Sequence, residues 1–181
     1  MNEWKKKVLE HYGEQSKQYL IASLYDQVPV RDNLGNLNIV DNMKDVINMK
    51  MNYIVIPRAP TPSTVVLNVY KIADKYETQK YKLDSKLTNS LRNYISNNAV
   101  VDKILFKTAR QKTTDIKLSG FLSNMNKKLE IKGAVNFTRK SNIKEKIQNK
   151  SGVTSQDEAV LSRKMGHSVQ TQKTYMTGVK K

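Results

Sequence analysis

Cysteine is absent from the 181-residue chain, and histidine occurs only twice, as His11 and His167. Disulfides, thiolate metal sites and thiol nucleophiles are therefore excluded, as is a zinc site built from several histidines. Long hydrophobic runs are also missing. The longest, Tyr53–Ile56, has the length of a strand, whereas a membrane span needs about 20 apolar residues. The first residues lack the apolar core of a secretory signal, so we expect an intracellular protein.

Acidic residues are scarce relative to basic ones. The chain has 32 lysines and arginines against 16 aspartates and glutamates, which gives a formal net charge of +16. Such an excess predicts a polyanionic partner, most often nucleic acid, with a membrane surface as the other option. The hydrophobic share of 38% is low, yet apolar residues recur periodically along most of the chain. Length and periodicity together predict one folded domain and not a disordered basic tail.

Helices are predicted at the start of the chain and again in its second half. The four-residue spacing of Trp4, Val8 and Tyr12 predicts a first helix. Ser16 is the expected N-cap of a second helix, which Pro29 ends. The patterns in the second half predict further helices near residues 83–97, 118–129, 138–151, 155–165 and 169–176.

Between these helical regions the sequence changes to β-branched and alternating patterns. Strands are predicted at residues 53–57, 64–71 and 76–83, with a proline-containing turn at 59–63 and a hairpin link at 72–75. We expect these strands to form a small antiparallel sheet near residues 52–83. The stretch 28–40 is predicted as loop and short strand, and 41–50 as short helix or loop. The predicted fold class is therefore mixed, mainly α with a small antiparallel β-sheet.

Five side chains are candidates for chemistry on a phosphodiester: Arg31, Lys71, Arg139, His167 and Tyr175. Arginine forks bind the non-bridging phosphate oxygens in pairs of hydrogen bonds and keep their charge as the pentavalent state develops. A tyrosine hydroxyl can attack phosphorus and leave again, which conserves the bond energy in a phosphotyrosyl link. A lysine can protonate the departing 5′ oxygen, so this chemistry requires no metal.

Each of these residues taken singly also has an ordinary structural interpretation. An arginine in so basic a chain is most often a solvated surface charge, and a lone histidine is more often a hydrogen-bonding group than a catalyst. Most of the nine tyrosines should pack in the core or at its rim. The runs Lys5–Lys7 and Lys127–Lys128 are interpreted as solvated faces. Composition and spacing alone therefore predict only a basic, mostly helical protein that binds nucleic acid.

Four segments, in this order, resemble the tyrosine recombinase (phage integrase) family. Val28–Ile39 resembles the first-arginine motif, in the form seen in eukaryotic DNA viruses and large DNA transposons, and Asn68–Gln79 resembles the β-hairpin that holds the catalytic lysine. Val135–Ser141 resembles the motif of the second arginine. Leu161–Tyr175 is similar to the family's C-terminal element, in which Gly-His-Ser precedes the nucleophilic tyrosine. The resemblance runs from about Ser16 to Tyr175 and implies the fold of the catalytic domain of that family.

The resemblance also implies a role for each candidate. Arg31 and Arg139 would bind the scissile phosphate, and Tyr175 would attack it. Lys71 would be the general acid, with Lys75 as its rival in the same turn. His167 would assist phosphate binding or proton transfer.

The sequence departs from the family pattern at three points. Asn136 stands where the family commonly has histidine, and it can support the phosphate by donating a hydrogen bond. Leu34 stands where an acidic residue is common. The eight residues from His167 to Tyr175 are one fewer than usual.

The leading functional hypothesis is a site-specific DNA recombinase or integrase that works through a 3′-phosphotyrosyl intermediate without metal or cofactor. A type IB topoisomerase-like enzyme and a catalytically degenerate DNA-binding relative are the alternatives. A basic structural protein of a virion or of chromatin is a further alternative. We expect residues 1–181 to form one catalytic domain without the N-terminal DNA-clamping domain of the family.

Double-stranded DNA is the partner that the resemblance implies. The resemblance also allows the chain to assemble into a tetramer on that DNA. The isolated chain is expected to be a monomer. No membrane and no small-molecule substrate are expected. The protein should lie wherever its target DNA lies, the host nucleus and a viral factory being two options.

Overall fold

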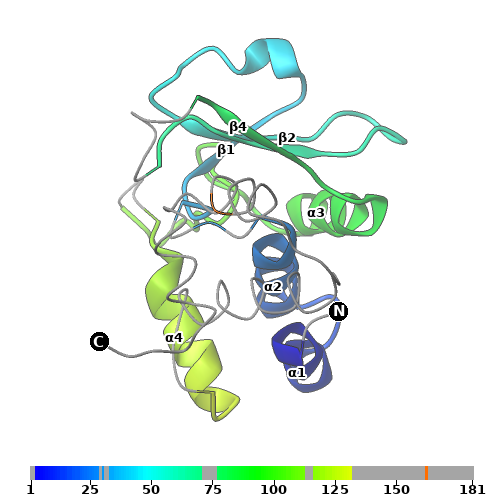
Figure 1. The fold of residues 1–181 in the computed structure, drawn as a ribbon, viewed down its shortest axis with the longest axis vertical. Helices are drawn as coiled ribbons and strands as arrows, with labels where there is room; N and C mark the ends of the chain where they lie inside the picture. Colours follow the sequence, from blue (N-terminus) through cyan, green and yellow to red (C-terminus); the bar gives the residue numbers. More distant parts are fainter. Residues whose placement is uncertain are drawn as a thin grey trace.

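The computed structural model describes residues 3–28, 30, 33–70, 77–112, 116–131 and 162. These residues form a mixed sheet with helices packed on one of its faces (Figure 1). In chain order the elements are α1 (Glu3–Tyr12), α2 (Lys17–Gln27), β1 (Leu37–Val40), the 3-10 helix η1 (Met43–Asp45), β2 (Asn52–Val55), β3 (Thr64–Leu67), β4 (Gln79–Lys82), α3 (Ser85–Asn97) and α4 (Leu118–Lys128).

Helix α2 lies at the centre of the helical layer. All seven residues from Tyr19 to Tyr25 are buried, so the helix is enclosed on every side, as is expected of a helix without a polar face. Its first turn is capped by Ser16, whose Oγ accepts a hydrogen bond from the backbone N–H of Tyr19 at 3.1 Å. Before it, α1 buries Trp4 and Val8 and is followed by Gly13 at a positive φ of 79°. Both helices predicted at the start of the chain are confirmed.

Helices α3 and α4 bury the apolar residues that repeat along them. Asp84 is the N-cap of α3, and its Oδ1 accepts a hydrogen bond from Leu87 N–H at 2.7 Å. On α4 the side chain of Asn126 is fully buried and accepts a hydrogen bond from Trp4 Nε1 at 2.8 Å, which joins α4 to α1. Both helices are confirmed within two residues of their predicted ends.

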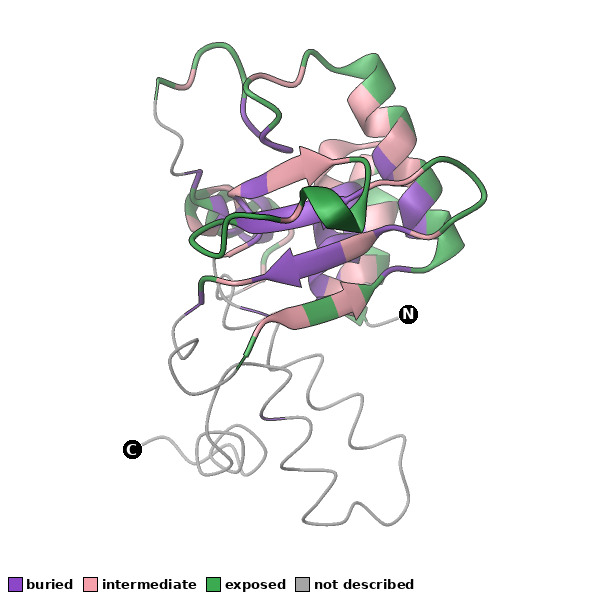
Figure 2. Ribbon diagram, turned by 90° about the horizontal axis from the view of Figure 1, so that it is seen from above, coloured by how far each residue is buried: buried purple, intermediate pink, exposed green. Residues whose placement is uncertain are grey.

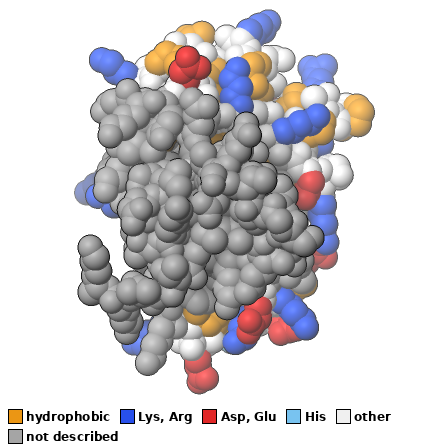
Figure 3. Space-filling model, in the orientation of Figure 1, with side chains coloured by type: hydrophobic (Ala, Val, Ile, Leu, Met, Phe, Trp, Pro, Cys, Tyr) orange, Lys and Arg blue, Asp and Glu red, His pale blue; other side chains and the backbone are white. Residues whose placement is uncertain are grey.

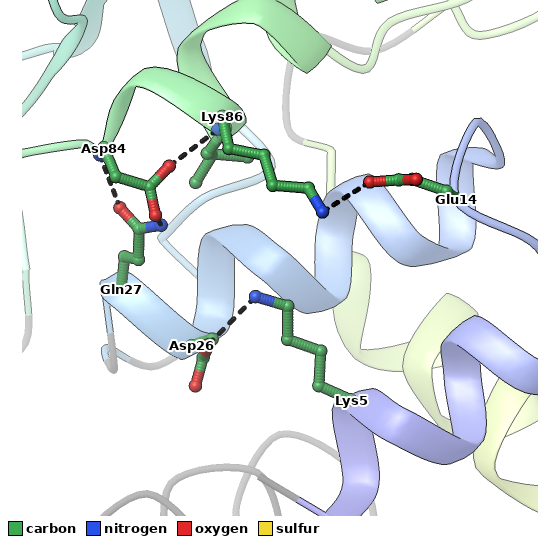
Figure 4. A network of polar contacts seen from close by, with 7 residues as sticks. Lys5, Glu14, Asp26, Gln27, Asp84 and Lys86 are labelled. Carbon is green, nitrogen blue, oxygen red and sulfur yellow. Dashed lines mark hydrogen bonds and ion pairs between the residues drawn. The ribbon is translucent and has the colours of Figure 1, made fainter. Parts of the chain in front are cut away.

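Polar contacts at the surface fix how α1, α2 and α3 lie against one another (Figure 4). Lys5 of α1 contacts Asp26 of α2 at 3.1 Å. Gln27 of α2 exchanges two hydrogen bonds with the cap of α3, because its Nε2 donates to Asp84 Oδ2 and its Oε1 accepts from Asp84 N–H. A third contact joins Lys86 to Glu14 at 2.6 Å, and this pairing raises the pKa of the lysine.

The sheet has the strand order β1-β2-β3-β4. Strands β2, β3 and β4 are antiparallel neighbours, with Ile54 opposite Val65 and Val65 opposite Tyr81, which confirms the predicted three-stranded sheet. Strand β1 adds to it in parallel, with Ile39 opposite Ile54. The predicted antiparallel sheet therefore has one additional, parallel strand, which makes the whole sheet mixed. Parallel pairing depends on the path of the connection between two strands, here residues 41–51, which strand periodicity does not reveal.

The two faces of the sheet have different coverings. The inner face contributes Ile54, Val65 and Leu67 to the main core beneath the helices. On the outer face a second, smaller apolar cluster forms, and Figure 2 shows the exposed segment around η1 lying over the strands there. That cluster consists of Tyr53, Val55 and Val66, with Val40 and Val46 packed against them. The segment 41–50 was predicted as short helix or loop, and it contains a short 3-10 helix as well as loop.

Several predictions cannot be compared with the described residues. The hairpin link at 72–75 and the helices near 138–151 and 169–176 lie outside them. Ser162, within the helix predicted near 155–165, is helical and buried. In the described ranges no helix has the length and apolarity that crossing a membrane requires.

Gly35 generates a prediction about stability. A Cβ at this position would lie 1.6 Å from the backbone oxygen of Ile116, just before α4. Because backbone is the obstacle, Gly35→Ala should lower the free energy of unfolding by about 3 kcal/mol. Gly120 in α4 is the matched control, since nothing lies within 4 Å of the position that an added methyl group would take there.

Gly120→Ala should raise stability by about 0.5–1 kcal/mol, because alanine favours the helix. Urea unfolding followed by the fluorescence of Trp4, the one tryptophan, measures both variants. Equal stability of Gly35→Ala and the wild type would contradict the close approach of Gly35 to Ile116.

Candidate active site

All seven residues predicted for the site lie outside the described residues. They are Arg31, Lys71, Lys75, Asn136, Arg139, His167 and Tyr175. The structure does describe the residues that flank the first three of these, on the loop after α2 and at the end of β3. Those flanking residues form the frame of the candidate site.

The loop that carries Arg31 is anchored in the core on both sides. Val28 and Val30 before it and Leu34 after it are buried, Leu34 completely. Val28 N–H continues the hydrogen bonding of α2 by donating to Leu24 O at 2.7 Å. The burial of Leu34 also explains why this position has no acidic side chain here, since an unpaired carboxylate would be costly in the core.

A second anchor follows directly after Leu34. Gly35 approaches the backbone of Ile116 so closely that no side chain fits, and Asn36 Oδ1 accepts a hydrogen bond from Ile116 N–H. The loop after Arg31 is thereby fixed to the segment that leads into α4. Sequence patterns indicate neither contact, because both depend on a residue about 80 positions away.

At the end of β3 the side chain of Asn52 makes the hydrogen bonds that hold the chain beyond the backbone pairing of β2 and β3. The ladder between β2 and β3 ends at Tyr53 opposite Val66. Beyond it, Asn52 Oδ1 accepts hydrogen bonds from the N–H groups of Asn68 and Val69, at 2.9 and 2.8 Å, and its Nδ2 donates to Val69 O at 2.9 Å. These contacts fix the chain two residues before Lys71.

The two ends of the segment around Lys71 and Lys75 are joined by side-chain hydrogen bonds. Tyr70 donates its hydroxyl hydrogen to Glu77 O at 2.8 Å, and Thr78 Oγ1 donates to Asn68 Oδ1 at the same distance. The hydroxyl of Tyr70 at one end of this segment therefore lies against the backbone of Glu77 at the other end.

One hydrogen bond joins the two parts of the frame. Asn33 Nδ2, on the loop that carries Arg31, donates to Val69 O at 3.2 Å. Val69 O thus receives amide donors from both Asn33 and Asn52. Neither asparagine is among the residues predicted for the site. The sequence does contain an indication for Asn52, since it is a polar residue at the start of an otherwise apolar strand.

Basic side chains are exposed on β4, the strand that follows the frame. On β4, Lys80 and Lys82 are exposed and lie on the outer face of the sheet, opposite Val66 and Thr64. Figure 3 shows lysine and arginine side chains spread around the outline of the molecule, with acidic side chains between them. In the described ranges no group of three or more histidine, aspartate or glutamate side chains could hold a metal ion.

Lys17 is a basic residue in a different environment, at the start of α2. Its ammonium lies 5.5 Å from the ring centre of Phe106 and 5.9 Å from that of Phe121, and burial lowers its pKa. Cation–π contact with the two rings offsets part of this desolvation. Lys17 belongs to the packing between α2 and α4 and not to the frame around Arg31 and Lys71.

Comparison with known proteins reveals a shared fold. No family model and no curated protein matches the chain. The solved structure of XerA recombinase is similar over 97% of this chain, with a TM-score of 0.58 and 16% sequence identity. An integrase of the transposon Tn1549, solved with a circular-intermediate DNA, is similar over 95%, with a TM-score of 0.54 and 12% identity.

The chain spans 59% of the length of the first of these chains and 57% of the second. At such low identity the similarity is evidence of fold. The predicted fold class is confirmed: the chain has a mixed α and β fold like that of tyrosine recombinase catalytic domains.

Proposed function

We propose that the chain is the catalytic domain of a tyrosine recombinase or integrase, which cuts and rejoins DNA through a 3′-phosphotyrosyl intermediate. Its fold is similar to that of a recombinase and of a transposon integrase. Its motifs carry the residues of that chemistry in the family's order. The observation that carries the proposal is the hydrogen bond between Asn33 and Val69, since it joins the loop of Arg31 to the hairpin of Lys71.

Covalent geometry strengthens this point. Arg31 precedes Asn33 by two residues, and Lys71 follows Val69 by two. Two residues span at most about 7 Å, so each candidate is tethered close to the hydrogen-bonded pair. A phosphate gripped by Arg31 would then lie within reach of a lysine on the hairpin, as the proposed reaction requires.

The proposed reaction has two steps, cleavage and rejoining. The oxygen of Tyr175 attacks phosphorus and loses its proton to His167 or to solvent, while the bond from phosphorus to the 5′ oxygen breaks. Lys71, or its rival Lys75, gives a proton to that oxygen, which leaves as a hydroxyl. Attack by a 5′ hydroxyl then reverses the sequence and releases the tyrosine. Arg31 and Arg139 would stabilise the charge of the pentavalent state, with Asn136 as an additional hydrogen-bond donor.

The partner under this proposal is double-stranded DNA, on which the chain would assemble into a tetramer. No cofactor takes part. A source among eukaryotic DNA viruses or mobile elements fits the form of the motif around Arg31.

A DNA-binding relative that no longer cuts is the second candidate function. Two observations favour it: Asn136 cannot carry a proton, and the interval from His167 to Tyr175 is one residue short. In a helix one residue corresponds to a rotation of about 100°, which would turn the tyrosine hydroxyl away from the phosphate. A topoisomerase-like activity would share the first reaction step and differ in lacking exchange between strands.

Both candidates predict strongly salt-dependent DNA binding. Lysine and arginine side chains displace counterions from phosphates, and the net charge is +16. Between about 50 and 200 mM salt the affinity should fall by about 10³-fold or more if about six or more phosphates are contacted. Fluorescence anisotropy with a labelled duplex measures this fall. A nearly constant affinity would argue against DNA as the partner.

Covalent trapping separates the two candidates. Incubation with a nicked DNA substrate, from which the cleaved end diffuses away, should yield a protein–DNA adduct visible on a denaturing gel. Tyr175→Phe removes only the hydroxyl oxygen, so the adduct should disappear while DNA affinity is unchanged. An adduct that persists in Tyr175→Phe would assign the attack to another residue. A wild type that forms none supports the binder.

The same assay tests the phosphate clamp. Arg139→Ala should slow adduct formation by about 10²–10³-fold, because one charge contact to the pentavalent phosphate is lost. His167→Ala should slow it less. Equal rates for Arg139→Ala and the wild type would remove Arg139 from the proposed site.

A further inference from the structure

The asparagines that fix the end of β3 form a polar cluster at the edge of the core, and Asn52 is its buried member. Asn52 is 7% exposed and begins β2, the strand whose other residues, Tyr53 to Val55, are also buried. A buried amide is costly unless its donors and acceptors are paired. Here Oδ1 accepts two backbone N–H groups and Nδ2 donates to one backbone carbonyl, all within 2.9 Å. Asn52 therefore serves a specific geometry.

All three contacts of Asn52 reach the same short stretch, Asn68 and Val69. The neighbouring side chains fix that stretch further. Asn68 Nδ2 donates to Met51 O at 2.9 Å, and Asn68 Oδ1 accepts from Thr78, directly before β4. The hairpin that carries Lys71 therefore starts from a point held by β2 on one side and by the residue before β4 on the other.

Asn33 extends the cluster to the loop of Arg31. Its amide donates to the carbonyl of Val69, which is also the acceptor for Asn52. The backbone of Asn52 is held in turn by Asn38 of β1, whose Nδ2 donates to Asn52 O at 3.0 Å. A displacement of Val69 would break the contacts to Asn33 and Asn52 together, so the loop and the hairpin are coupled through one carbonyl group.

We propose that Asn52 and Asn33 are positioning residues, which set the distance between the general acid Lys71 and the phosphate bound by Arg31. This inference rests on the proposed function. Neither asparagine touches the DNA in this role. Proton transfer requires the lysine within hydrogen-bond reach of the leaving oxygen, and a misplacement of about 1 Å can cost about 10²-fold in rate.

The test compares two DNA substrates that differ in the leaving atom. One has the normal 5′ oxygen at the scissile phosphate, and the other has sulfur in its place. A thiol is far more acidic than an alcohol, with a pKa of about 8.5 for the cysteine thiol, so the sulfur leaves as a thiolate without a general acid. A defect that lies only in placing Lys71 should therefore vanish on the sulfur substrate.

Two variants probe the cluster, and a third serves as the control. Asn33→Ala removes one donor at the surface, and Asn52→Asp keeps the acceptor but loses the donor to Val69. Asn98→Ala is the control, since Asn98 also donates its amide to a backbone carbonyl, that of Tyr94, at 2.8 Å. Lys71→Ala gives the reference behaviour for a missing general acid. Thermal melts establish that each variant is folded. If Asn52→Asp does not fold, Asn33→Ala alone decides the test.

At saturating DNA, adduct formation on the oxygen substrate should slow by about 10- to 100-fold in Asn33→Ala and Asn52→Asp. Both should approach the wild-type rate on the sulfur substrate, as Lys71→Ala should, and Asn98→Ala should match the wild type on both. If Asn33→Ala and Asn52→Asp keep the wild-type rate on the oxygen substrate, or slow equally on both substrates, the positioning role is overturned. The proposed function is unaffected by that outcome. A wild type that forms no adduct with either substrate overturns the proposed function, and this inference with it.

Discussion

The structure depends on the burial of α2. A helix whose residues from Tyr19 to Tyr25 are all buried must be enclosed by the rest of the chain, since each fully buried large apolar side chain contributes about 1.5–3 kcal/mol. The main core around it draws on α1, α3, α4 and the inner face of the sheet. The loop that carries Arg31 leaves directly from this helix, so the candidate site is attached to an element that lies deep in the core.

Apolar burial does not by itself decide how the elements are oriented, and polar contacts supply that information. The pair of hydrogen bonds between Gln27 and Asp84 sets α3 against α2, and the buried bond from Trp4 to Asn126 sets α4 against α1. Exposed ion pairs such as Lys86 with Glu14 contribute little to stability. Orientation depends instead on the buried and paired hydrogen bonds, and those of Asn52 act in the same way at the end of β3.

Local patterns predicted most of the described fold. Helix periodicity and the expected cap Ser16 indicated the four helices, and β-branched or alternating patterns indicated β2, β3 and β4. The short strand predicted within residues 28–40 is present as β1, but its parallel pairing with β2 was not predicted, because that pairing depends on how residues 41–51 cross the sheet. Asn52 was missed because a polar residue at a strand end is usually solvated. The predicted catalytic residues were found by their resemblance to a family, and their arrangement stays a prediction.

Strand β4 has a consequence for the behaviour of the protein in concentrated solution. Among the strands of the described residues it is the last one of the sheet, and its Lys80 and Lys82 are exposed. An open strand edge invites a second molecule to add a strand of its own, which begins aggregation. Two like charges along that edge would meet the same two charges on any copy that approached in this way. Within the described residues, these two charges therefore oppose the pairing of β4 with the same strand of a second copy.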